Sequence, residues 1–212
     1  MHDIFSAEQQ PAGAFRASAP AAFLQLLVAK AQIAAVPRII IDGPSGSGKS
    51  TLGKYLARQL DAELVHLDNV YASWDGLADA GQRVATELLG PLSQGQVGRI
   101  RHWDWHRNKP AKWQEVSATR PVVVEGSAAL NSKTAPLATL RIWVEVADEA
   151  ARKNRALTQR PGGEIYAPYW EHWGAQERAH ITAEKPYKLA DLWVRPGVLP
   201  GEPLYTLVAG EL

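Results

Sequence analysis

Short apolar runs, rich in β-branched residues, alternate along the chain with longer segments in which apolar residues recur every three or four positions. The short runs predict buried strands, because a strand that is covered on both faces needs no polar alternation. We expect such strands over residues 38–42, 63–67, 121–125, 140–146 and 192–194.

The longer segments predict helices over residues 23–35, 49–60, 77–89, 148–158 and 168–183. Pro37 stops the first helix, the pair Gly90 and Pro91 ends the third, and Asp148 caps the fourth. Helices that alternate with fully apolar strands predict an α/β fold, in which a parallel sheet is covered by helices on both faces.

The first 20 residues are rich in alanine, proline, serine and glutamine, and we expect this segment to be loose. The chain has 212 residues, of which 46% are hydrophobic, so it can bury a sizeable core. The length suits one domain over residues 21–212.

The balance of charges, with a formal net charge of +1, argues against a dedicated nucleic-acid-binding protein. The sequence has no cysteine, which excludes disulfides and favours a reducing compartment such as the cytoplasm. The apolar segment 21–36 is too short and too often interrupted by polar residues to span a membrane. We therefore expect a cytoplasmic protein whose partners are small molecules, not nucleic acids or membranes.

Residues 41–50, IDGPSGSGKS, join a predicted strand to a predicted helix and fit the pattern G-x-x-x-x-G-K-[ST]. Glycine permits the backbone angles that turn successive N–H groups toward one anion, and the N-terminus of the next helix adds partial positive charge. Lys49 would reach the β- and γ-phosphates of a nucleoside triphosphate, and the Ser50 hydroxyl can ligate Mg²⁺. The expected phosphate-binding residues are Gly43, Pro44, Ser45, Gly46, Ser47, Gly48, Lys49, Ser50 and Thr51.

The expected nucleotide is ATP. GTPases of this class read guanine with an Asn-Lys-x-Asp element, and the Asn-Lys pair at residues 108–109 is followed by Pro110 and Ala111 instead.

Two acidic residues lie where predicted strands end, which is where ligands bind in an open parallel sheet. Asp68, in HLDNVY, could accept a proton from an attacking hydroxyl, or it could be an ordinary turn residue. Glu125, in VVVEGS, could hold Mg²⁺ directly or through water, or it could cap a helix. With Ser50, both carboxylates are candidate metal ligands.

Aromatic, imidazole and guanidinium groups are concentrated in residues 98–113, GRIRHWDWHRNKPAKW. On a strand, Trp103 and Trp105 would share one face. A flat aromatic wall with polar donors such as His106 and Arg107 suits an acceptor with a ring, such as a nucleobase. The alternative is that the tryptophans fill the core and the arginines are solvated.

A basic segment, ARKNRALTQRPGG at residues 151–163, places Arg152 and Arg155 on one helical face and Arg160 at the start of a glycine-rich loop. Mobile arginines neutralise charge during phosphoryl transfer, and a closing segment expels water. We expect a lid around residues 152–165, although a solvated helix face would show the same pattern. Helical spacing also relates three further residues, His172, Gln176 and His180. A metal site there would need another carboxylate or imidazole ligand.

Taken in order, these motifs resemble the uridine kinase branch of the P-loop nucleoside and nucleotide kinases, and the loop GPSGSGKS also resembles that of cytidylate kinases. The resemblance covers about residues 36–196. It implies a P-loop NTPase fold. The segments that carry it are GPSGSGKS, HLDNVY, WDWHR, VVVEGS, RKNRALTQRPGG and YKLADLWV.

The resemblance also implies roles for individual residues. Asp68 would be the catalytic base, followed at Tyr71 by the tyrosine of the family's Asp-x-x-Tyr step, and Trp103 and His106 would face the acceptor. The lid arginines would be Arg152, Arg155 and Arg160. Two features depart from the family: the interval from Lys49 to Asp68 is shorter, and Trp103 replaces a tyrosine.

The sequence therefore predicts a phosphotransferase that uses ATP and Mg²⁺ and acts on a small acceptor, a nucleoside in the first place. A nucleoside monophosphate kinase is an alternative, since Arg99, Arg101 and Arg107 could bind an existing phosphate. Other small-metabolite kinases share the scheme. A regulatory nucleotide-binding switch is the alternative outside the enzymes, and it would not need Asp68 beside an aromatic acceptor site.

Overall fold

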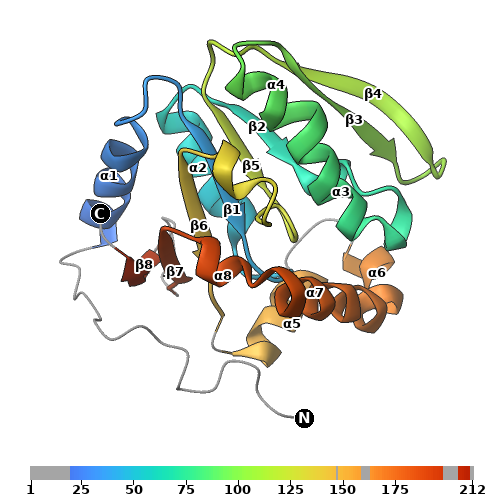
Figure 1. The fold of residues 1–212 in the computed structure, drawn as a ribbon. Helices are drawn as coiled ribbons and strands as arrows, with labels where there is room; N and C mark the ends of the chain where they lie inside the picture. Colours follow the sequence, from blue (N-terminus) through green and yellow to red (C-terminus); the bar gives the residue numbers. More distant parts are fainter. Residues whose placement is uncertain (1–19, 147, 159–162, 198–204, 211–212) are drawn as a thin grey trace.

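The computed structural model describes residues 20–146, 148–158, 163–197 and 205–210. A six-stranded sheet with the strand order β2-β5-β1-β6-β7-β8 forms its centre (Figure 1). Neighbouring strands are parallel except for the pair β7 and β8, which is antiparallel. The strands are Arg38–Asp42 (β1), Glu63–His66 (β2), Val122–Glu125 (β5), Leu140–Val144 (β6), Leu192–Pro196 (β7) and Tyr205–Gly210 (β8).

Successive residues of the central strand β1 face opposite sides of the sheet, because side chains alternate along a strand. Ile39 and Ile41 pack in a core cluster with helices α1 (Pro20–Ala31) and α2 (Lys49–Gln59). Ile40 packs in a second cluster, with the helical segments that begin at Leu77 and with α7 (Trp170–Glu184). The sheet is therefore covered on both faces, which confirms the predicted α/β architecture.

The helix that starts at Leu77 continues past Gly90 and Pro91, so the predicted end at this pair is wrong. Helix α3 (Leu77–Arg83) runs into a π-helical turn (η4, Val84–Leu89) and then into α4 (Gly90–Ser93). The N–H of Gly90 donates to the carbonyl of Ala85, five residues back, and Pro91 lies in the first turn of α4. The wide π turn thus absorbs a proline that would otherwise break the α-helix.

A two-stranded hairpin that the sequence pattern did not predict lies beside this helix (Figure 1). It consists of β3 (Gly98–Asp104) and β4 (Lys109–Val116), and its register shifts between Arg101 and Trp103. Both strands are largely exposed on one side, so they lack the continuous apolar run by which the central strands were found. Strand β8 also went unpredicted.

The remaining helices gather at one end of the sheet (Figure 1). Helix α5 (Glu149–Thr158) starts at the predicted cap, because the N–H of Ala151 donates to Oδ1 of Asp148 at 3.0 Å. The shorter segments are α6 (Gly163–Tyr166), α8 (Pro186–Leu189) and the 3₁₀ turns η2 (Leu67–Asn69), η3 (Ser73–Asp75), η5 (Ala135–Leu137) and η6 (Ala167–Tyr169).

Some predictions concern residues outside the described ranges. These include nearly all of the segment 1–20, of which Pro20 begins α1, and Arg160 in the predicted lid. Within the described part of the chain, no helix combines the length and apolar character that crossing a membrane requires.

Candidate functional site

The loop between β1 and α2 has the conformation that its glycines permit. Gly46 and Gly48 have φ angles of 78° and 98°, in the left-handed region that favours glycine. A Cβ atom on Gly46 would also lie 2.3 Å from the backbone oxygen of Arg152, so helix α5 contacts the loop closely. The Lys49 side chain is 7% exposed and folds back over the loop, where Nζ donates to the carbonyl of Pro44 at 3.0 Å.

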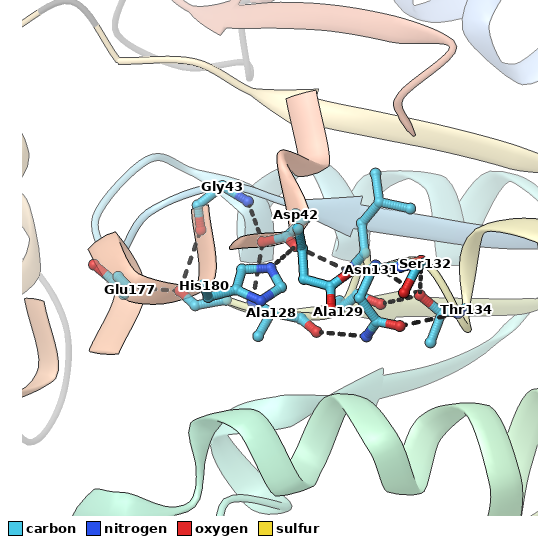
Figure 2. Close-up of polar contacts among 12 residues, drawn as sticks. Asp42, Gly43, Ala128, Ala129, Asn131, Ser132, Thr134, Glu177 and His180 are labelled. Carbon is cyan, nitrogen blue, oxygen red and sulfur yellow. Dashed lines mark hydrogen bonds and ion pairs between the residues drawn. The ribbon is translucent and has the colours of Figure 1, made fainter. Parts of the chain in front are cut away.

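A buried carboxylate at the end of β1 holds the first residue of this loop. Asp42 is 1% exposed, and its Oδ1 accepts the N–H of Gly43 at 2.6 Å and that of Ala128 at 3.2 Å (Figure 2). Its Oδ2 accepts the N–H of Leu130 at 2.8 Å. Asp42 thereby ties the loop to the segment that follows β5. Sequence reasoning missed this residue, although an acid at the end of an apolar run was the available signal.

Six of the predicted phosphate-binding residues line one cavity of about 470 Å³: Ser45, Gly46, Gly48, Lys49, Ser50 and Thr51. Lys49 and Ser50 line it from α2, Asp68 from η2, Glu125 from the end of β5, and Arg155 from α5. The other lining residues are Lys54, His66, Asn69, Ser127 and Ala156. The structure thus brings together groups that bind anions and groups that bind cations, as a complex of phosphates with a metal ion requires.

The residues in this cavity fit Mg²⁺. They offer the hydroxyl of Ser50 and the carboxylates of Asp68 and Glu125, and Mg²⁺ prefers such oxygen ligands. Among the described residues no group of three or more His, Cys, Asp or Glu side chains is arranged to hold a metal, including the series at positions 172, 176 and 180. Mg²⁺ in phosphotransfer sites uses one or two carboxylates together with the phosphates, so a complete protein cage is not required. Glu125 is buried and its Oε1 lies 2.5 Å from Nδ1 of His66.

A second cavity, of about 310 Å³, has mostly aromatic walls. The ring of Trp74 is nearly parallel to those of two tyrosines: its centroid is 5.7 Å from that of Tyr166, which also lines the cavity, and 4.2 Å from that of Tyr169, which does not. Sequence reasoning had assigned four of the lining residues, Asp68, Tyr71, Trp105 and His106, to the acceptor site, and Ser45 to the phosphate loop. It missed Trp74, Tyr166 and Trp173, for which the high tryptophan content was the only signal. The other lining residues are Asn69 and Ile165.

The two cavities meet at Ser45, Asp68 and Asn69, which line both of them. The hairpin fixes this junction, because Nε1 of Trp105 donates to the backbone oxygen of Asp68 at 2.7 Å. The phenol of Tyr71 donates to the backbone oxygen of Ser127 at 2.9 Å, and burial raises the pKa of this tyrosine well above its usual value. Tyr71 therefore stays neutral in the lining of the aromatic cavity.

Six predicted site residues in the described part of the chain lie outside both linings, and their roles stay predictions: Gly43, Pro44, Ser47, Trp103, Arg107 and Arg152. Strand β3 ends at Asp104, so Trp105 lies beyond the strand and shares no strand face with Trp103. Arg107 is exposed, with Nη1 3.6 Å from Oδ2 of Asp104. Arg152 is buried, and its Nη1 donates to the backbone oxygen of Ser45 at 2.8 Å.

Helix α5 also contributes the one predicted lid arginine that faces the phosphate cavity in the described part of the chain. Nε of Arg155 donates to the backbone oxygen of Gly46 at 2.9 Å. Arg155 therefore reaches the loop without being buried, and it can turn toward a bound phosphate.

Comparison with known proteins supports this assignment of the loop and the fold. The cytidylate kinase family model matches residues 39–78, which include the glycine-rich loop, Asp68 and Tyr71. The solved structure of a possible uridine kinase from Bacillus stearothermophilus is 16% identical in sequence with a TM-score of 0.57, and the match covers 80% of this chain and 96% of that one. This likeness shows the α/β fold of P-loop kinases.

A second solved structure, provisionally described as a fructose transport system kinase from Silicibacter sp. TM1040, is 19% identical and covers 82% of this chain and 91% of that one. Its TM-score of 0.47 is too low to add to the fold assignment. The chain thus resembles P-loop kinases in its fold and its nucleotide-binding loop, as its sequence predicts.

Proposed function

We propose that this protein is an ATP- and Mg²⁺-dependent phosphotransferase that phosphorylates a hydroxyl of a small, ring-bearing acceptor, with a nucleoside as the first candidate. One observation carries the proposal: a phosphate cavity and an aromatic cavity meet at Asp68. A kinase needs this arrangement, because the acceptor hydroxyl must lie in line with the γ-phosphate.

On the nucleotide side, the roles follow from the linings. Lys49 and the N–H groups of the glycine-rich loop would bind the phosphates. Ser50, Asp68 and Glu125 would hold Mg²⁺, directly or through water, and the bound ion would neutralise charge on the phosphate oxygens. Arg155 would stabilise the negative charge of the transferring group.

On the acceptor side, Asp68 would orient the attacking hydroxyl and accept its proton. It extends from η2, directly after β2, and lines both cavities, so one carboxylate can contact a hydroxyl in the aromatic cavity and remain next to the phosphates. A positioned general base of this kind is typically worth about 10²–10⁴-fold in rate.

The chemistry of the aromatic cavity favours a nucleoside over a nucleoside monophosphate. Its volume of about 310 Å³ and its stacked rings suit one small planar ligand. Among the described residues, its lining includes no arginine or lysine that could bind an acceptor phosphate. Arg99 and Arg101 lie over the ring of Trp113 on the hairpin instead, at 5.8 and 5.6 Å from its centroid.

The acceptor can be identified by measuring ADP formation with MgATP against a panel of nucleosides, nucleoside monophosphates and small alcohols. We expect nucleosides to stimulate ADP formation and monophosphates to do so less. Faster turnover with monophosphates would make the protein a nucleotide kinase. If no acceptor stimulates the purified protein although it binds MgATP, the enzyme proposal fails and a regulatory nucleotide-binding switch becomes the better explanation.

A further inference from the structure

A buried carboxylate on helix α7 contacts the glycine-rich loop at Ser45. Glu177 is 4% exposed, and its Oε1 accepts two hydrogen bonds from Ser45, from the backbone N–H at 2.8 Å and from the hydroxyl at 2.6 Å. The same oxygen lies 2.7 Å from the hydroxyl of Ser127 and 3.2 Å from Nε1 of Trp173, and both donate to it. One oxygen atom therefore joins the loop, the segment after β5, and α7.

The charge of this carboxylate is balanced inside the protein. Nη1 of Arg152 lies 3.5 Å from Oε2 of Glu177 and donates to the backbone oxygen of Ser45. A buried carboxylate is tolerated only when it is paired and hydrogen-bonded, and both conditions are met here. Glu177 and Arg152 thus hold the same loop residue, one through its N–H and the other through its carbonyl group.

The groups that Glu177 joins belong to the two cavities of the proposed site. Ser45 lines both, Ser127 lines the phosphate cavity, and Trp173 lines the aromatic cavity. The position of Ser45 relative to Trp173 is therefore fixed by one side chain that itself lines neither cavity.

Helix α7 is also tied to the aromatic wall at two other points. Nε2 of His172 lies 2.7 Å from Oδ1 of Asp75, and Nε2 of Gln176 donates to the backbone oxygen of Trp74 at 2.6 Å. These contacts account for the helical spacing of His172 and Gln176 without a metal. Helix α7 therefore contacts both the loop, through Glu177, and the segment that carries Trp74, through Gln176.

We propose that Glu177 is a positioning residue that sets the glycine-rich loop against the acceptor cavity and so determines the rate of phosphoryl transfer. The proposal rests on the proposed function. It assigns to Glu177 an effect on alignment and not on nucleotide binding, because Lys49 and Ser50 line the phosphate cavity and Glu177 does not. A displacement of about 1 Å between reacting groups can cost on the order of 10²-fold in rate.

The test compares Glu177→Gln with Glu171→Gln, a matched control on the same helix whose side chain is 81% exposed and lines neither cavity. Glutamine keeps the length of the side chain but removes the charge. We expect E177Q to lower kcat by roughly 10- to 100-fold with the best nucleoside of the panel and to leave the Kd for MgATP within about threefold. E171Q should match wild type in both.

A double-mutant cycle with Ser45→Ala shows whether Glu177 acts through Ser45. If it does, the double variant should be less slow than the product of the two single effects, because Ser45→Ala removes the hydroxyl hydrogen bond to Glu177 and leaves only the one from the backbone N–H. In the nucleotide-free protein, the amide proton of Ser45 should shift upfield in E177Q and stay unchanged in E171Q, since the N–H loses a charged acceptor.

Each other outcome contradicts the proposal in a distinct way. Any of three results would overturn the positioning role alone. These are a wild-type kcat in E177Q, effects of E177Q and S45A that multiply, and equal losses of kcat and MgATP affinity with a lower Tm. A wild-type protein that phosphorylates no acceptor would overturn the proposed function and this role with it. Should E177Q fail to fold, S45A decides: a normal kcat in that variant overturns the proposal.

Discussion

The Asp68→Asn substitution tests the proposed chemistry most directly. Asparagine has nearly the size of aspartate but neither its charge nor its basicity. The backbone oxygen at position 68, which accepts the hydrogen bond of Trp105, is unaffected. Asp68 is exposed on the short turn η2, so the change leaves the core intact. The variant should therefore fold normally, and its activity should report on what the carboxylate does in the two cavities.

The expected loss follows from the position of the carboxylate. If Asp68 accepts the proton of the acceptor hydroxyl, kcat should fall by about 10²–10⁴-fold, or about 3 to 5 kcal/mol of transition-state stabilisation. If the carboxylate serves the proton alone, the MgATP affinity should change little, because Lys49, Ser50 and Glu125 still line the phosphate cavity; if it also holds Mg²⁺, MgATP binding should weaken as well.

The assay measures ADP formation at saturating MgATP with and without the best acceptor of the panel. MgATP affinity is measured separately over a range of Mg²⁺ concentrations. Asp79→Asn is the matched control, since Asp79 is exposed on α3 and lines neither cavity. It should behave as wild type in both measurements.

Two results would refute the reasoning. Acceptor-dependent turnover that survives in Asp68→Asn would exclude the general-base role, and Glu125 would be the next carboxylate to replace. A loss that excess Mg²⁺ restores would show instead that Asp68 serves the metal ion and not the proton.

Lys49→Ala should lower turnover by roughly 10²–10³-fold with the fold retained, because one charged phosphate contact is removed; normal turnover would refute the loop assignment. Arg155→Ala should lower kcat by roughly 10²-fold and weaken MgATP binding much less, whereas the reverse pattern in steady-state kinetics would indicate ground-state binding. Trp74→Ala should raise the acceptor KM by roughly 5- to 150-fold, as loss of ring stacking predicts, without a matching change in the KM for ATP. Burial opposes the charged form of His180, but the carboxylate of Asp42, 3.6 Å away, outweighs it and raises the pKa of this histidine above 6.5. Its charged form therefore stabilises the fold fully below about pH 6.5 and loses this contribution as pH rises through the raised pKa, so the Tm advantage of wild type over His180→Gln should shrink as pH rises above about 6.5; a constant difference would contradict the ion pair.

Several features of this protein follow from local sequence alone. The loop from Gly43 to Ser50 was predictable because its conformation and its charge depend on adjacent glycines, one lysine and the start of one helix. The central strands were predictable because burial on both faces demands a continuous apolar run. The Asp148 cap was predictable because it joins residues only three apart.

Long-range packing decided the rest. Glu177 lies 132 residues from Ser45 along the chain, and within α7 its pattern is that of an ordinary polar helix position. The aromatic cavity likewise combines η3, the hairpin, α6 and α7, whose tryptophans and tyrosines would fit a core equally well. A local pattern determines which side chains can be buried and which can bind a ligand. Which other side chains they contact depends on how the sheet and its helices pack. The sequence by itself therefore determined the phosphate loop and the α/β architecture. Only the tertiary structure decided which distant side chains contact that loop.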